Sequence, residues 1–377
     1  MSFFNGFKFS NEILNNKTLS LISVFLLEGI FFYNFTTPEF NVNVCQLPFW
    51  TLTVYFSWKI YNGDKVKIED CLLVGLFAAF GFLSKYLFVY ILISIDLLFI
   101  YLIFFKKQRK WDQKYLYTLV IFLIIIIPHL IWLANNDYIT IQYGLKRTGV
   151  DERFIFDHIK FPIIFILKQI GILIPFLFLV FLLIKKIKFK INLKDKKILF
   201  LIFINVVPIT LMFLTSFILG SKIRTMWMTP FYLFFGTLFL YIFKSQINLK
   251  RINKFLLSFI IIFLLSPFMY AFISVSKENK RTDYPGKEIA KSIEEVWNKA
   301  FLNQIKYVVG DEWYAGNLSY HISSRPIWYQ SIKGKTHELD PDGGIIYTDN
   351  ADDLEKICPG EFGKINQQGY CMIGIRK

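Results

Sequence analysis

Apolar and polar positions alternate in long blocks over most of the chain. Apolar segments lie at about 18–35, 43–61, 71–83, 86–105, 116–134, 161–184, 198–219, 228–243 and 255–275. A helix perpendicular to a bilayer needs roughly 20 apolar residues to cross it, and several of these segments are shorter. Water offers no way to bury so many apolar faces, so lipid is the expected solvent. The pattern predicts an all-α polytopic membrane domain with about nine hydrophobic segments.

The stretch Cys71–Phe105 is too long for one perpendicular helix, and Ser84-Lys85-Tyr86 interrupts it. It therefore predicts two short helices that meet at a polar turn. A single long tilted helix is the alternative interpretation.

Basic segments between the apolar blocks predict an orientation. Lysine and arginine gather at 106–110, 185–197 and 244–254. The positive-inside rule places such loops in the cytoplasm. The segments 135–160 and 220–228, and the tail after Ser276, then lie outside. Met1–Lys17 has no charged start that leads into a cleavable apolar core, so we expect the first apolar segment to remain as a membrane helix.

The tail predicts a small α+β domain. Lys287–Leu302 has helical periodicity, and Asn350–Glu355 suits the start of a second helix with Asn350 as its cap. Short strands are predicted at Lys306–Val309, Pro326–Tyr329, Gly344–Tyr347 and Tyr370–Ile375. We therefore expect a transmembrane domain over 1–276 and an extracytoplasmic soluble domain over 277–377.

The chain has four cysteines and no CxxC pair, which argues against a zinc-thiolate site. Cys358 and Cys371 both lie in the tail. If the tail is outside the cytoplasm they could form a disulfide, and the sequence leaves this open.

Composition agrees with a membrane protein. The hydrophobic share is 54%, against 45–50% in soluble domains. The net charge of +15 could suggest nucleic-acid binding. However, the basic residues lie in short segments between apolar blocks and form no separate basic domain, so we expect no nucleic-acid partner.

Two polar places in the first third of the chain are candidates for chemistry, because ionisable residues at membrane depth are costly. Glu39 lies in the polar turn Thr36–Asn43. Its carboxylate could hold a metal or position a hydroxyl nucleophile, or the turn is merely solvated. Lys85 lies between two apolar segments, where it either binds a lipid phosphate or extends to the membrane interface.

Two further polar places lie on the predicted outer side. The loop that begins at Pro128 continues to Lys146 and Arg147, two cations that could grip a phosphate or pyrophosphate. The turn Ser221–Pro230 contains Lys222 and Arg224. Cations on the outer side run against the positive-inside bias, and an anionic ligand would account for them.

Together these places resemble the GT-C membrane glycosyltransferases, in particular protein O-mannosyltransferases and the aminoarabinose transferases that modify lipid A. The matching positions are Thr37-Pro38-Glu39, a Gly-rich helix that begins at Gly75 and ends in Leu83-Ser84-Lys85-Tyr86, then Pro128, Ile131, Trp132, Asn135, Arg147, Trp227 and Pro230. In the tail, Gly310–Tyr320 followed by Arg325-Pro326 looks like the family's soluble domain. The likeness extends over nearly the whole chain.

The resemblance implies a reaction in which a sugar leaves a polyprenyl phosphate carrier for a lipid, glycan or protein acceptor on the outer membrane face. It implies that Lys85 and Arg224 bind the lipid phosphate, with Lys222 and Arg147 as further candidates. Glu39 matches the family's second acidic position, where the family has Asp. The residues expected in the substrate pocket are Tyr86, Trp132, Asn135 and Trp227. A bacterial inner membrane is the expected location. Whether the reaction uses a divalent metal stays open.

One part of the family pattern has no counterpart. The family's first outer loop carries the acidic residue that is its catalytic base, whereas Met1–Lys17 contains only Glu12. Roughly 100 residues of the pattern are missing, which indicates a fragment or a member without its base.

Two other classes of function remain. A transporter or flippase is disfavoured, since we see no repeated halves and no paired broken helices. A non-catalytic protein that binds the lipid carrier is the alternative to the glycosyltransferase.

Overall fold

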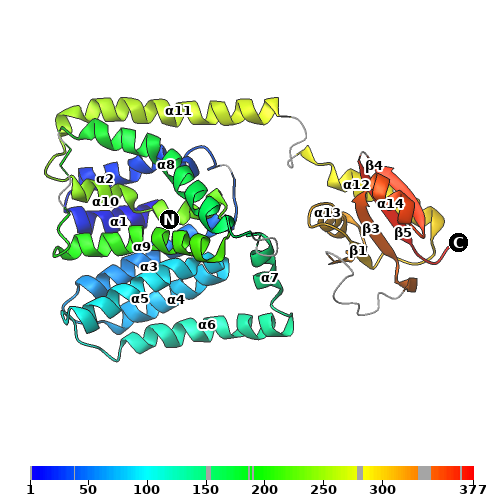
Figure 1. The fold of residues 1–377 in the computed structure, drawn as a ribbon, viewed down its shortest axis with the longest axis horizontal. Helices are drawn as coiled ribbons and strands as arrows, with labels where there is room; N and C mark the ends of the chain where they lie inside the picture. The colour runs from blue at the N-terminus through cyan, green and yellow to red at the C-terminus, as the bar shows by residue number, and fades with distance from the viewer. Residues whose placement is uncertain are drawn as a thin grey trace. The chain divides into compact units, whose positions relative to one another are not determined.

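The computed structural model describes residues 2–37, 39–149, 154–185, 187–188, 191–277, 283–329, 341–365 and 367–377. The chain forms two compact units, Met1–Ser274 and Val275–Lys377. Figure 1 shows the first unit as a set of packed helices and the second as a sheet with helices.

The described residues of the first unit form helices joined by loops. Its first part contains α1 Ser2–Leu14, α2 Lys17–Phe25, the 3-10 helices η1 Leu26–Gly29 and η2 Phe31–Tyr33, α3 Val42–Asn62, α4 Ile68–Ser84, η3 Tyr86–Phe88, α5 Val89–Ile100, the π-helix η4 Tyr101–Phe105, α6 Tyr115–Asn135 and α7 Ile139–Lys146. The remainder contains α8 Asp157–Leu183, α9 Lys196–Leu219, η6 Thr225–Tyr232, α10 Phe235–Ile242, η7 Leu249–Arg251 and α11 Ile252–Ser276.

Fewer helices than predicted are long and apolar enough to cross a membrane. Among the described residues there are five: Tyr86–Phe105, Tyr115–Asn135, Asp157–Leu183, Lys196–Leu219 and Leu249–Ser276. The pair η6 and α10, bent by 54°, makes a sixth if it counts as one span. The all-α character of this unit agrees with the prediction, whereas the number of nine segments is not confirmed.

The other three predicted segments differ for physical reasons. The segment 18–35 is divided among α2, η1 and η2, and Ile30 has an extended backbone between the last two. Helix α4 has 17 residues, which is short for a span. Helix α3 has 21 residues but buries polar side chains such as Gln46 and Thr51 among its neighbours. A helix that faces protein needs less apolar surface than one that faces lipid.

Helix α1 is not among the predicted elements, yet it lies in the core. Phe9 is fully buried, and its ring centre lies 4.8 Å from that of Phe234. At the end of the helix, Lys197 donates to the Ile13 carbonyl at 2.6 Å and Lys244 donates to the Leu14 carbonyl at 2.8 Å. Lysines at a helix C-terminus satisfy its last carbonyl groups and complement its dipole.

The stretch Cys71–Phe105 forms two helices, as predicted. Helix α4 ends at Ser84, and Lys85 has an extended backbone with φ −168° and ψ 131°. The next helical turn, η3, begins at Tyr86. The alternative of one long helix is wrong, because Lys85 breaks the helical backbone.

The loops of this unit gather into two sets at opposite ends of the helices (Figure 1). In one set, the Lys222 N–H donates to the Thr148 carbonyl at 3.1 Å and joins the two loops predicted to lie outside. In the other, the Arg251 guanidinium donates to the Ile184 carbonyl at 2.8 Å and joins two basic segments predicted to be cytoplasmic. The contacts therefore group the loops as the alternation of charge predicts.

The second unit is a five-stranded sheet in the order β2-β1-β3-β5-β4. The strands are β1 Tyr307–Val309, β2 Ile327–Tyr329, β3 Ile345–Asn350, β4 Glu361–Ile365 and β5 Gln368–Ile373, with helices α12 Gly286–Ala300, α13 Tyr314–His321 and α14 Ala351–Ile357. Strands β2, β1 and β3 are parallel, and β5 is antiparallel to β3 and β4. The four predicted strands and two predicted helices are present, whereas β4 and α13 are additional.

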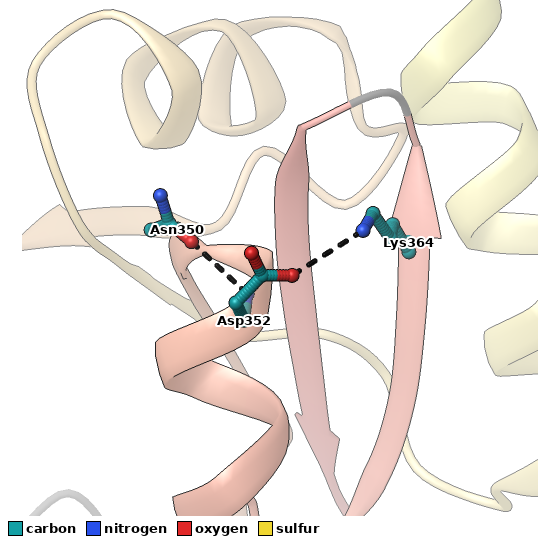
Figure 2. A network of polar contacts seen from close by, with 3 residues as sticks. All are labelled: Asn350, Asp352 and Lys364. Carbon is teal, nitrogen blue, oxygen red and sulfur yellow. Dashed lines mark hydrogen bonds and ion pairs between the residues drawn. The ribbon is translucent and has the colours of Figure 1, made fainter.

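The start of α14 confirms the predicted cap. The Asp352 N–H donates to the Asn350 side-chain oxygen at 3.0 Å. Asp352 also pairs with Lys364 of β4 at 3.5 Å, and Figure 2 shows the three residues together. The disulfide that the sequence left open is present, joining Cys358 after α14 to Cys371 in β5.

Candidate functional site

A cavity of about 660 Å³ lies among the loops predicted to be outside. Its walls come from the η1–η2 region and the following turn, the end of α7, α8, and the loop that leads into η6. The lining side chains that carry charge are Glu39, Lys146, Arg147, Lys168, Lys222 and Arg224. Five residues singled out from the sequence therefore meet here, although they are up to 185 positions apart (39 to 224).

Among the described residues, the lining of this cavity is unbalanced in charge, with five cations and one carboxylate. Among the described residues, the side chains of Lys168, Lys222 and Arg224 have no hydrogen-bond or ion-pair partner. The Glu39 side chain is exposed and has none either. Arg147 donates to the Tyr143 hydroxyl and has further interactions. Unpaired cations that converge on one space favour an anion that can accept several charged hydrogen bonds, as a phosphate does.

Lys85 lies near this cavity but is not in its lining. Its ammonium group donates to the Asn43 side-chain oxygen and lies 5.1 Å from the ring centre of Trp227. Burial, and the nearby charge of Arg147, lower the pKa of Lys85 to about 7. Trp227 belongs to η6, whose neighbouring residues line the cavity. The structure thus brings Lys85 together with Trp227 and, less closely, with Arg147.

The remaining predicted pocket residues lie in a different cluster. The Tyr86 hydroxyl forms hydrogen bonds of 2.7 Å with His129 of α6 and with Thr140 of α7. The Trp132 ring stacks on His129 with centres 5.8 Å apart and is 45% exposed. Asn135, at the end of α6, is also exposed. Neither Trp132 nor Asn135 lines the cationic cavity.

Sequence reasoning missed three ionisable residues inside the apolar segments. Glu28 and Lys168 line a second cavity of about 470 Å³, and Asp96 of α5 lines a separate one. An ionisable residue within an apolar segment is itself a signal of function, and it was available for all three. Glu28 lies inside the predicted segment 18–35, and interpreting that segment as one continuous span leaves the Glu28 carboxylate out of the predicted site.

The part of the chain that the structure describes contains no group of three or more His, Cys, Asp and Glu side chains that could hold a metal ion. In the described lining of the cationic cavity, the only carboxylate is that of Glu39. No metal-ligand set can therefore be assigned to the described residues.

Comparison with known proteins gives one finding. Residues 7–132 match the family model described as dolichyl-phosphate-mannose-protein mannosyltransferase. Neither the curated proteins nor the solved structures give a match. The matched third of the chain includes Glu39 and Lys85 and ends before Arg147. This part of the chain is thus similar to membrane mannosyltransferases of that family, and the site residues after 132 rest on the structure alone.

Proposed function

We propose that this chain is an integral membrane glycosyltransferase that moves a sugar from a polyprenyl-phosphate carrier to a cell-envelope acceptor. The observation that carries the proposal is the cavity in which five cations converge beside Glu39. The match of residues 7–132 to a mannosyltransferase family supports the same reaction class.

The chemistry needs what this cavity offers. When the bond between the sugar and the phosphate breaks, the lipid phosphate gains negative charge, and cations already in place stabilise it without reorganisation. A cavity at the end of membrane helices also lets a polyprenyl chain stay in lipid while its phosphate reaches the cations. An apolar chain with an anionic head therefore fits this part of the molecule.

Each predicted residue has a proposed role. Arg224, Lys222 and Arg147 bind the phosphate in the cavity, and Lys85 contributes a further charge from its position beside Trp227. We propose Glu39, on the cavity lining, as the acidic residue that the acceptor hydroxyl meets. Tyr86, Trp132 and Asn135 form a rim near α6 and α7 that contacts the substrate farther from the phosphate.

The proposed location is a bacterial inner membrane, with the cavity and the second unit on the outer side. The positive-inside rule supports this side for the loops. The disulfide between Cys358 and Cys371 supports it for the second unit, because disulfides persist in oxidising compartments.

A non-catalytic protein that binds the lipid carrier is the second candidate. The exposure of Glu39, which has no partner among the described side chains, favours it, because a catalytic base is normally held in place by its neighbours. Both candidates need the cationic cavity to bind a polyprenyl phosphate, and only the first needs sugar transfer.

The first experiment measures thermal stabilisation of the purified protein by polyprenyl phosphate, with neutral polyprenol as the control lipid. We expect the phosphate to raise the unfolding temperature and polyprenol to leave it unchanged. The double variant Lys222→Ala/Arg224→Ala should bind the phosphate at least about a hundredfold more weakly, because each of the two charged hydrogen bonds contributes about 1.5–3 kcal/mol.

The matched control is Lys188→Ala/Lys250→Ala, which removes two exposed cations from the other set of loops. Its affinity should equal that of the wild type. An equal loss in both double variants would mean that the lipid responds only to net charge and would overturn the proposed site. If the phosphate binds and no sugar is transferred to any acceptor, the non-catalytic alternative is favoured.

A further inference from the structure

The second cavity adjoins the cationic one and holds a different set of side chains. It has a volume of about 470 Å³ and lies between the η1–η2 region, α8 and α11. Phe31, Lys168 and Thr225 line both cavities, so the two share a wall. Its own carboxylate is Glu28, which the first cavity lacks.

Glu28 is half-buried and only partly satisfied. Its carboxylate accepts a hydrogen bond of 2.5 Å from the Asn34 side-chain amide. Among the described residues, no cation pairs with the Glu28 carboxylate. No carboxylate among them pairs with Lys168, which lines the same cavity. A carboxylate has about four acceptor positions, so most of those on Glu28 remain open to a ligand.

The turn that carries Glu28 is seated firmly on α8. A Cβ atom added to Gly29 would lie 2.6 Å from the Cα atom of Phe176, so only glycine allows this close approach. Elsewhere on α8, a Cβ atom at Gly171 would meet nothing within 4 Å. The cavity lining is therefore tightly packed at Gly29 and has open space at Gly171.

The groups in this cavity favour a ligand that both donates and accepts hydrogen bonds, which a phosphate does not do. Glu28 accepts hydrogen bonds, whereas Asn34 and Lys168 donate them. The rings of Phe31 and Phe35 are stacked with centres 5.4 Å apart and offer an apolar face beside these polar groups. A neutral ring with several hydroxyl groups satisfies donors and acceptors together and presents C–H groups to the aromatic face. Carbohydrates have this chemistry.

We propose that the second cavity is the subsite for the donor's sugar, in which Glu28, held by Asn34, accepts hydrogen bonds from the sugar hydroxyls. The inference rests on the proposed function, since the adjoining cations hold the phosphate to which the sugar is attached. Lys168 lines both cavities and lies where the sugar and the phosphate meet.

The test compares lipids with the same charge. The probes are polyprenyl phosphoryl mannose and polyprenyl phosphoryl glucose, and the reference is polyprenyl methyl phosphate, a phosphodiester without a sugar. The wild-type full chain should bind at least one sugar lipid tenfold or more tighter than the reference. Glu28→Gln should abolish that preference and leave the affinity for polyprenyl methyl phosphate unchanged, because one wall of the sugar site loses its charged acceptor.

Two more variants make the result specific. Gly171→Leu fills the open space at that position without touching a polar group and should also abolish the preference. Glu69→Gln removes an exposed carboxylate at the start of α4 and should leave the preference for the sugar lipid unchanged.

The two proposals fail separately. If the reference lipid does not bind the wild type, the proposed phosphate site is wrong. If the reference lipid binds and neither sugar lipid binds more tightly, or if Glu28→Gln and Gly171→Leu keep the preference, the sugar subsite is overturned while the phosphate site stands.

Discussion

At the scale of single residues, Lys85 is a cation whose surroundings favour the binding of an anion. Its ammonium group has a neutral partner, Asn43, and an aromatic neighbour, Trp227, but none of the described carboxylates pairs with it. Burial and the charge of Arg147 both disfavour its protonated form. A phosphate beside Lys85 would supply the missing negative charge and favour that form.

The pH dependence of binding follows from this environment. The pKa of Lys85 lies at about 7, below its ordinary value of 10.5. Between these values the folded protein has lost a proton that the unfolded chain keeps, so the ligand-free stability contribution of Lys85 rises with pH over this range. Binding has the opposite sign, because the anion needs the protonated amine. Affinity for polyprenyl methyl phosphate should fall by up to about tenfold per pH unit above 7.

Lys85→Arg provides the control, because its guanidinium keeps its charge throughout this range and should flatten the profile. Lys85→Met should bind weakly at every pH, measured as affinity from pH 6 to 9. A wild-type profile as flat as that of the arginine variant would exclude Lys85 from the phosphate site.

The sequence predicts the site residues unevenly, and the reason is physical. Glu39, Arg147, Lys222 and Arg224 line one cavity, and the alternation of charge predicts that their loops share one side of the membrane. The contacts of Lys85 depend on how α3 and η6 pack against the α4–η3 turn, which periodicity does not encode. Tyr86 and Trp132 lie in an aromatic cluster with His129 for the same reason.

At the scale of elements, helices α1 and α2 show that hydropathy alone does not predict how short helices pack. These helices are short, and both pack against α10. Buried Ser10 forms a hydrogen bond of 2.5 Å with Thr237 of α10. A Cβ atom at Gly236 would lie 2.0 Å from the Ser23 carbonyl oxygen, so α10 and α2 touch through backbone. Small residues permit such close approach between membrane helices.

This contact predicts the effect of one methyl group. Gly236→Ala must separate α10 from α2 and should lower the free energy of unfolding by about 1–3 kcal/mol, the usual cost of overpacking. The measurement is the thermal unfolding midpoint in detergent. Gly6→Ala is the matched control, since a Cβ atom there meets nothing within 4 Å and the helix gains propensity. Equal midpoints in the two variants would show that α10 is not packed directly on α2.

At the scale of the whole molecule, charge alternation and the disulfide are two independent indications of the side of the membrane on which the second unit lies. The basic loops predict the orientation of the membrane unit, and an outer position of the tail follows only if α11, which follows the basic segment 244–254, crosses the membrane. The Cys358–Cys371 bond depends on the redox conditions around the second unit and not on the count of spans.

The redox state of the cysteines therefore tests the orientation of the chain in cells. We expect a variant with Cys45→Ala and Cys71→Ala to react with a maleimide polyethylene glycol, after denaturation, only when a reductant is added first. In a Cys358→Ser variant of the same background, Cys371 should react without reductant, which controls for access to the reagent. Reaction of both tail cysteines without reductant would place the second unit in the reducing cytoplasm. Either α11 would then not cross the membrane, or the whole membrane unit would be inverted and the cationic cavity would face the cytoplasm.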